Sequence, residues 1–81
     1  YNATEKTKTL VYPNPTNGLL TIVVADQKLI GSLARVYDES GRLLQSVKIT
    51  ATAQTINLTS YLGGIYFIIL ENKESLKIIK K

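Results

Sequence analysis

Asp38 and Glu39 are adjacent carboxylates in this 81-residue chain, and they are its first candidates for acid–base chemistry or cation binding. A calcium ion needs six or more oxygen ligands, which two neighbouring carboxylates do not supply. The chain contains no histidine, so the usual general base and metal ligand is missing. It contains no cysteine either, which excludes thiolate nucleophiles and thiolate metal sites. We therefore interpret these two carboxylates as residues of a solvent-exposed turn.

Nucleophilic and phosphate-binding patterns are missing as well. None of the five serines lies in a G-x-S-x-G elbow or beside an activating partner in the sequence. Gly63-Gly64 stands before a predicted strand, whereas a phosphate-binding glycine loop opens a helix. We predict that the chain is not an enzyme, and we expect neither a cofactor nor a bound metal.

The positive charge of the chain is concentrated in its last residues. Residues 73–81 contain four lysines and one glutamate, a local net charge of +3, whereas the whole chain carries +4. A nucleic-acid-binding domain usually spreads basic residues over one face and interleaves them with aromatic rings. This chain has two arginines and one phenylalanine, so we expect no nucleic-acid partner. The basic end fits either a solvated terminus or a surface for an acidic partner or an anionic membrane.

The length supports one small domain, because 81 residues are too few for two hydrophobic cores. Residues 1–8 are polar and are predicted to be a linker remnant, whereas residues 9–81 are predicted to form the folded domain. The polar start also suggests that this domain lies last in a longer chain. The longest apolar run, Ile65 to Leu70, is far shorter than the ~20 residues that cross a bilayer, so no transmembrane segment is expected.

Short apolar runs recur roughly every ten residues, and each is bounded by Gly, Asn, Asp or Ser. This spacing predicts an all-β fold, an Ig-like antiparallel β-sandwich of about seven short strands. The strands are expected at residues 9–12, 19–25, 32–38, 43–49, 54–58, 64–70 and 75–80. At most one helical turn is expected, around Thr59–Leu62.

Alternation within these runs predicts which side chains face the core. The predicted inward set includes Leu20, Ile22, Val24, Ala34 and Val36. Residues 64–70 are apolar on both faces, which predicts a central strand that is covered on both sides. Tyr66 lies near the start of this strand, where a tyrosine of an Ig-like sandwich bonds its hydroxyl to the preceding corner. Residues 75–80 are expected at a sheet edge, where lysines discourage unwanted pairing.

Two tight turns can be assigned from residue types. Asp38 at the first position and Gly41 at the last position are typical of a type I turn, which would join two strands as a hairpin. Asn72-Lys73 is expected to join the last two strands, because asparagine tolerates the left-handed conformation.

The stretch PNPTNG is dense in conformationally restricted residues. Pro13 and Pro15 fix φ and lack an N–H donor, and Asn14 is held extended because a proline follows it. Asn17 and Gly18 are expected to supply the positive φ that reverses the chain into the next strand. A stiff, non-pairing turn at a sheet edge explains all of these residues, and a recognition epitope on the loop is the alternative.

Four segments follow one another in a diagnostic order. They are Tyr12-Pro13-Asn14-Pro15-Thr16-Asn17-Gly18, then Val36-Tyr37-Asp38-Glu39-Ser40-Gly41-Arg42, then a corner with Leu58, Leu62, Gly64, Ile65 and Tyr66, and finally the basic Lys77, Lys80 and Lys81. With these segments, residues 9–81 resemble the C-terminal sorting domain of type IX secretion system cargo proteins, the type A sorting domain of the Por secretion system.

The resemblance implies a folded secretion label without activity of its own. The fused N-terminal cargo would pass through the periplasm, and shuttle proteins and the type IX translocon of the outer membrane would recognise the domain. The cargo would then reach the cell surface or the medium, and a surface sortase would cleave near Tyr1–Thr9 and join it to an anionic lipopolysaccharide. The residues implied as recognition or family-motif positions are Pro13, Asn14, Pro15, Asn17, Gly18, Asp38, Gly41, Gly64, Tyr66, Lys77, Lys80 and Lys81.

The competing hypothesis is an Ig-like or fibronectin-like accessory module that binds carbohydrate or acts as a spacer. A sugar-binding module exposes a planar aromatic platform, and Tyr37 is the one tyrosine predicted to point outward on a sheet face. Exposed strand edges would also allow a homodimer formed by edge pairing or domain swapping, and the oligomeric state is left open. If the final strand is the part that the machinery recognises, deletion of Ile78–Lys81 is expected to stop export.

Overall fold

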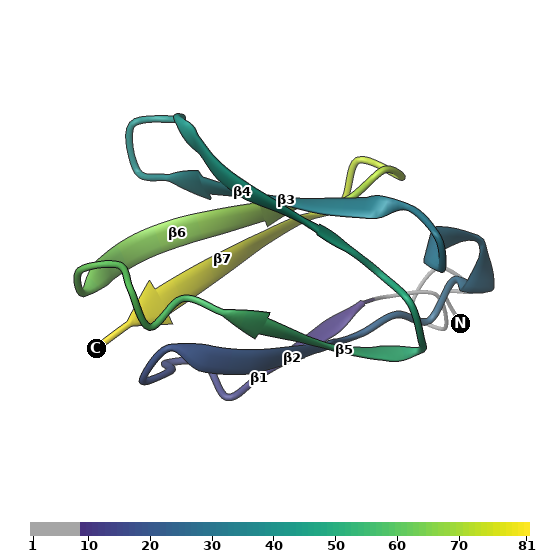
Figure 1. The fold of residues 1–81 in the computed structure, drawn as a ribbon, viewed down its shortest axis with the longest axis horizontal. Helices are drawn as coiled ribbons and strands as arrows, with labels where there is room; N and C mark the ends of the chain where they lie inside the picture. The colour runs from purple at the N-terminus through teal and green to yellow at the C-terminus, as the bar shows by residue number, and fades with distance from the viewer. Residues whose placement is uncertain (1–8) are drawn as a thin grey trace, which may run out of the picture.

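The computed structural model describes residues 9–81, which fold into two antiparallel sheets packed face to face (Figure 1). The strands are β1 (Leu10–Tyr12), β2 (Leu19–Val23), β3 (Leu33–Asp38), β4 (Leu43–Lys48), β5 (Ala53–Asn57), β6 (Gly64–Ile69) and β7 (Ser75–Lys80). One sheet has the order β1-β2-β5 and the other the order β4-β3-β6-β7. The predicted all-β sandwich of seven short strands is therefore confirmed, with strand bounds within two residues of those expected. The predicted linker, residues 1–8, lies outside the described residues.

The core fills the space between the two sheets with side chains from alternate strand positions, as the pleat requires. The buried apolar residues are Leu20, Ile22, Val24, Leu29, Ala34, Val36, Ile49, Ile56, Leu58, Tyr66, Ile68, Leu70 and Ile78. All of the inward side chains predicted from alternation belong to this set. Burial of each large aliphatic side chain stabilises the fold by about 1.5–3 kcal/mol relative to exposure.

Strand β6 is central in its sheet, as predicted, because it pairs with β3 on one side and β7 on the other. The prediction that both of its faces are covered is wrong. Ile68 is fully buried in the core, whereas Phe67 points to the opposite face and is half-buried. No strand or helix within residues 9–81 is layered on that outer face (Figure 1). The apolar character of this strand is thus greater than the described fold requires.

The helical turn forms elsewhere than expected. A short 3-10 helix spans Gln27–Leu29, and its first turn is capped by Asp26, whose carboxylate accepts a hydrogen bond from the Lys28 N–H. The expected position, Thr59–Leu62, is instead a tight turn in which the Tyr61 N–H donates to the Leu58 carbonyl. Asp26 at the N-cap is a residue type that commonly caps such a turn, so the sequence carries a recognisable signal for it.

Both predicted hairpins are present. In the β3–β4 hairpin the Gly41 N–H donates to the Asp38 carbonyl at 3.0 Å, and Gly41 adopts a positive φ of 90°. In the β6–β7 hairpin the left-handed residue is Lys73, with φ 74°, and not Asn72 as expected. The Asn72 side chain has a different task, because its oxygen accepts a hydrogen bond from the Glu74 N–H and closes the turn.

The start of the described chain is tied to this second hairpin. Thr9 is buried, and its N–H and hydroxyl donate to the two carboxylate oxygens of Glu74 at 3.1 and 2.8 Å. Within residues 9–81, no helix has the length and apolar composition needed to cross a bilayer.

Candidate recognition site

The four sequence segments that stand in diagnostic order come together at one end of the sandwich (Figure 1). We call this region the motif end and define it as residues 13–18, 38–42, 58–64 and 77–81. The loop of residues 13–18 is hydrogen-bonded to the last strand. The hairpin and the corner line common hollows on the surface. Segments separated by more than 60 residues in sequence therefore form one continuous surface.

The loop of the opening motif covers the free edge of β7. Asn14 Nδ2 donates to the Lys77 carbonyl at 2.8 Å, and the Ile79 N–H donates to Asn14 Oδ1 at 2.9 Å. Further along the strand, the Thr16 N–H donates to the Ile79 carbonyl and the Lys81 N–H donates to the Thr16 carbonyl, both at 2.9 Å. These four bonds satisfy the outward-pointing backbone groups of the strand from residue 77 to residue 81. We call this arrangement the edge clip.

The edge clip corrects the prediction of a non-pairing turn. Pro13 and Pro15 have no N–H to offer, and both are exposed. The side-chain amide of Asn14, which carries a donor and an acceptor as a peptide group does, makes the strand contacts in their place. The loop therefore pairs with the sheet through the Asn14 side chain and the Thr16 backbone, and residue propensities do not reveal the side-chain contact. The last strand is at a sheet edge, as predicted, but this edge is covered.

Thr16 is a structural residue that the sequence analysis did not single out. It is buried, with 1% of its surface exposed, and its hydroxyl donates to the Leu19 carbonyl at 2.7 Å and accepts from the Gly18 N–H at 3.0 Å. Its backbone also pairs with Lys80 in an isolated parallel bridge. A threonine two residues before the glycine of an Asn-Gly turn is a recognisable signal, because Ser and Thr hydroxyls often close such turns.

Gly18 allows the opening loop to approach the corner closely. It has a positive φ of 136°, and its carbonyl accepts a hydrogen bond from the Leu58 N–H at 2.7 Å. A Cβ atom at this position would lie 2.6 Å from Thr59 Cγ2 and 2.9 Å from Thr59 Cα. Asn17, in contrast, is exposed and does not adopt a positive φ, so the reversal depends on the glycine alone.

The corner before β6 is held by Tyr66. Its hydroxyl donates to the Leu62 carbonyl, and its ring stacks on Tyr61 with centroids 5.8 Å apart. This is the tyrosine-corner arrangement predicted for an Ig-like sandwich. Because the bond fixes the backbone of Leu62, the side chain of that residue is held outward, with 85% of its surface exposed.

The glycines of the corner adjoin the end of the last strand. A Cβ on Gly63 would lie 3.0 Å from the backbone carbon of Lys81, so a larger residue would press on the final residue of the structure. Gly64 begins β6 and stands opposite Lys80 in the β6–β7 ladder. The predicted positions Gly64, Lys80 and Lys81 are therefore neighbours, although 16 residues separate the glycine from the first of these two lysines.

The hairpin segment of the motif end is organised by the carboxylate of Asp38. Its Oδ1 accepts hydrogen bonds from the Ser40 hydroxyl at 2.7 Å and from the N–H groups of Ser40 and Arg42 at 3.0 and 2.9 Å. Its other oxygen pairs with Arg42 Nε at 3.2 Å. The Ser40 hydroxyl, followed by the Arg42 N–H, lowers the pKa of Asp38 below its ordinary value, because these donors stabilise the ionised form. Asp38 is thus a structural carboxylate, as the turn interpretation predicted.

The three predicted lysines lie on and just beyond β7, where the strand pleat places Lys77 and Lys80 on opposite faces. Lys77 and Lys81 are exposed and Lys80 is half-buried. The ion pairs within residues 9–81 join Arg35 to Glu71 and Arg42 to Asp38. None of the three lysines takes part in either pair, so their charges are free to meet a partner. The Lys77 carbonyl and the Lys81 N–H form bonds of the edge clip. The ammonium groups of the three lysines add positive charge that no ion pair within residues 9–81 neutralises.

The chemistry of this end is that of a binding surface. Within residues 9–81, no group of three or more His, Cys, Asp or Glu side chains is arranged to hold a metal ion. Every buried side-chain nitrogen or oxygen in this part of the chain has a hydrogen-bond partner. The surface consists of loops on a rigid scaffold, where binding residues commonly lie, and it presents an exposed leucine and unpaired lysines.

Comparison with known proteins agrees with a module that acts by binding. Residues 10–81 match the family described as "Secretion system C-terminal sorting domain". The chain is also 33% identical over 76 residues to Beta-agarase A of Zobellia galactanivorans, an alignment that covers 91% of this chain and 13% of that relative. The chain belongs to the family of secretion system C-terminal sorting domains, and it is a sorting signal of type IX secretion. It thus spans a small part of the length of the relative that it matches.

Proposed function

We propose that the motif end is the part of the domain that the type IX machinery recognises. In this proposal a shuttle protein or the translocon of the outer membrane contacts β7 together with the loop that clips its edge. The observation that carries the proposal is the joining of the opening and closing motifs through Asn14 and Thr16. A protein that binds this surface would contact the opening and closing motifs at the same time. It would therefore bind the folded domain and not an unfolded chain.

We propose that most of the recognition positions shape the surface and that the lysines contact the partner. Pro13, Asn14, Pro15 and Gly18 shape and attach the clip, whereas Lys77, Lys80 and Lys81 offer their ammonium groups to the partner. Asp38, Gly41, Gly64 and Tyr66 hold the hairpin and the corner beside them. Asn17 is exposed on the loop and makes no side-chain hydrogen bond within residues 9–81, so we propose that it neither shapes the clip nor contacts the partner. An acidic partner surface fits this set because the lysine charges have no ion pair within residues 9–81.

The remaining steps follow from membership of the family. The domain, residues 9–81, would be carried through the periplasm on its N-terminal cargo and cross the outer membrane with it. A surface sortase would then cut the chain before the domain, near residues 1–9, and leave the cargo on the cell surface or in the medium. Throughout, the domain would act by binding alone and would need no cofactor.

An export assay tests the proposal. The 81 residues are fused behind a fluorescent protein that carries a periplasmic signal peptide, and surface and medium fluorescence are compared in hosts with and without the type IX system. The expected result is export in the first host and periplasmic retention in the second. Equal export from both hosts would overturn the proposed function.

A second variant in the same assay addresses the lysines. Deletion of Ile78–Lys81 would remove a fully buried core residue as well as the clip, so it does not separate recognition from folding. Replacing the side chains of Lys80 and Lys81 by serine keeps the backbone bonds and removes the charge. Export is expected to fall for this double variant while its melting temperature stays near that of the parent, and unchanged export would contradict the role of these lysines.

A further inference from the structure

The outer face of the four-stranded sheet carries an apolar surface that the described fold leaves open. Cross-strand pairing places Leu43 opposite Tyr37, Tyr37 opposite Phe67, and Phe67 opposite Lys77, so one row of side chains crosses all four strands. Side chains of directly opposed residues in antiparallel strands point to the same face. Ile65 and Ile79 form a second pair on this face.

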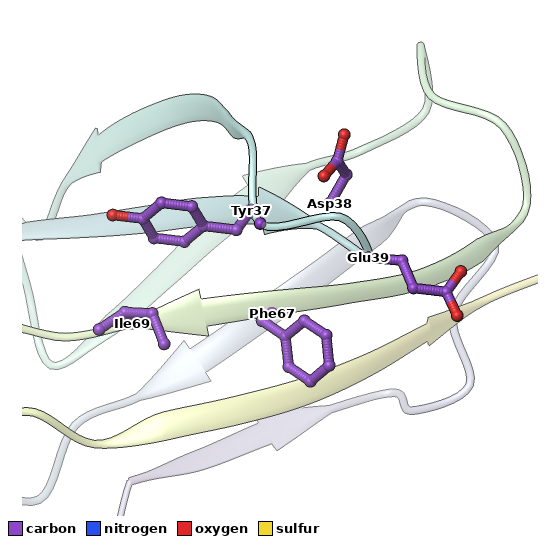
Figure 2. A pocket seen from close by; sticks show the side chains of 6 residues that line it. Tyr37, Asp38, Glu39, Phe67 and Ile69 are labelled. Atoms are coloured by element: carbon purple, nitrogen blue, oxygen red, sulfur yellow. The ribbon is translucent and has the colours of Figure 1, made fainter.

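The centre of this face is an open hollow of about 300 Å³. In Figure 2 the Tyr37 ring lies near Ile69 and the Phe67 ring extends from β6 in another direction, with Asp38 and Glu39 toward the hairpin; all five residues line the hollow. The two aromatic rings and the isoleucine are half-buried, and at the margins Leu43 and Ile79 have 49% and 44% of their surface exposed. We call the surface formed by Leu43, Tyr37, Phe67, Ile69, Ile65 and Ile79 the outer apolar patch.

The composition of β6 is difficult to explain without a partner for this patch. A solvent-exposed sheet face normally carries polar residues at alternate positions, and a strand that is apolar on both faces is normally covered on both. In β6 the outward residues Ile65, Phe67 and Ile69 are all apolar, although no described element covers them. Aromatic and aliphatic side chains gathered around a hollow are typical of the central contacts of a protein interface.

Charge beside the patch indicates the chemistry of the partner. Lys77 faces the same side as Phe67 and has no ion pair within residues 9–81. Arg35, also on this face, is already paired with Glu71 at 2.8 Å. Within residues 9–81, Lys48 of β4 also lies on this face without an ion pair, whereas Glu39 at the hollow carries an unpaired negative charge. The unpaired charge on this face is therefore net positive, and a second copy of the chain would present the same positive face. An acidic partner is favoured over self-association.

We propose that the outer apolar patch is a second docking surface, which binds an acidic protein component of the secretion machinery. An apolar side chain of the partner occupies the hollow between Tyr37 and Phe67, and a carboxylate of the partner meets Lys77. This inference rests on the proposed secretion function and adds the outer face of the four-stranded sheet to the motif end, which it adjoins along β7 at Lys77 and Ile79. Binding at both surfaces would contact the sandwich at its motif end and on the outer face of the four-stranded sheet.

The test uses the reporter fusion with two variants of the patch and two matched controls. Phe67→Thr keeps a strand-favouring residue but removes the ring, and Leu43→Thr shortens an exposed side chain of the patch that lies outside the motif end. The controls are Leu10→Thr and Leu19→Thr, two exposed leucines of the other sheet. Export of each patch variant is expected to fall about tenfold, a typical loss for a central interface residue, and export of the controls less than about twofold.

The outcomes separate this inference from the proposed function. Normal export of both patch variants, with export of the parent fusion intact, would overturn the docking surface and leave the proposed function standing. No export of the parent fusion in the host that has the type IX system would overturn both. Because Leu43 is exposed and lies outside the motif end, a fall in export of Leu43→Thr with an unchanged melting temperature supports the docking surface even if Phe67→Thr unfolds.

Sedimentation equilibrium of the isolated 81-residue chain completes the test. The expected result is a monomer for the parent and for Phe67→Thr. A dimer of the parent that dissociates in Phe67→Thr would show that a second copy occupies the patch, and it would overturn the assignment of this surface to the secretion machinery.

Discussion

The Ile79 N–H donates a hydrogen bond to Asn14 Oδ1 at 2.9 Å, although the two residues are 65 positions apart. The side-chain amide of Asn14 also donates to the Lys77 carbonyl, so one side chain replaces a peptide group of a neighbouring strand. The consequence is that the opening loop and the closing strand of the domain form a single unit. An unfolded chain, or a chain that lacks either segment, would not form this unit. A protein that binds the unit would therefore select folded, complete domains.

The edge clip should contribute measurably to stability. Asn14→Ala removes two hydrogen bonds and uncovers the edge of β7, and since a typical bond contributes about 0.5–1.5 kcal/mol net, we expect a loss of about 1–2 kcal/mol. Asn17→Ala in the same loop removes an exposed side chain and is expected to change stability by less than about 0.5 kcal/mol. Urea denaturation of the two variants measures the difference, and equal midpoints would contradict the clip.

Gly18 should be intolerant of a side chain. Gly18→Ala would place a Cβ 2.9 Å from the backbone of Thr59 at a positive φ of 136°, so we expect destabilisation by more than about 2 kcal/mol. Gly31 is a matched control, because its φ is also positive, at 97°, but nothing lies within 4 Å of the position that an added Cβ would take. Gly31→Ala should cost only the backbone strain, about 1–2 kcal/mol. Thermal unfolding ranks the two, and the reverse order would refute the close approach.

The corner before β6 should depend on one hydroxyl. Tyr66→Phe keeps the ring and its stacking on Tyr61 but removes the donor to the Leu62 carbonyl, and we expect a loss of about 1 kcal/mol. Tyr61→Phe is the control, because the Tyr61 hydroxyl makes no hydrogen bond within residues 9–81. Chemical denaturation curves of the two variants should differ in midpoint, and coincident curves would argue against the tyrosine corner.

The β3–β4 hairpin should be sensitive to acid. Because the folded state lowers the pKa of Asp38, this carboxylate stabilises the fold above its unfolded pKa of about 3.9, and the stabilisation is lost as the pH falls through the folded value. Asp38→Asn should therefore weaken the fall of the melting temperature below about pH 4. Glu39→Gln, which alters an exposed neighbour, should leave the profile unchanged. Identical profiles for parent and Asp38→Asn would contradict this role.

Local sequence patterns predicted the strands and the core because burial in a sandwich follows a period of two along each strand. The inward positions Ile22 and Val36 could be assigned from alternation alone, and both are fully buried. The Asp38 turn was equally local, since its side chain bonds only to residues within four positions. A contact between residues that are close in the sequence can therefore be predicted from the local sequence pattern.

Long-range side-chain contacts were not predictable in the same way. The pairing of Asn14 with β7 depends on how two sheets bring distant segments together, and an asparagine between two prolines carries no sign of it. The open face of β6 was missed for a related reason. A strand with apolar residues on both faces is expected to be covered on both, but its sequence does not tell whether the covering layer belongs to the same chain or to a partner. Phe67 is a large apolar side chain on a face that no described element covers, and this favours a partner on that face.

The measurement that tests the central claim most directly compares export of the reporter fused to Asn14→Ala and to Asn17→Ala. Both variants lose an exposed asparagine side chain from the same loop, but only the first loses the bonds to Ile79 and Lys77. At a temperature where both domains are folded, we predict reduced surface fluorescence for Asn14→Ala and export equal to the parent for Asn17→Ala. Equal export of the two variants would contradict the claim that the machinery reads the clipped edge of β7.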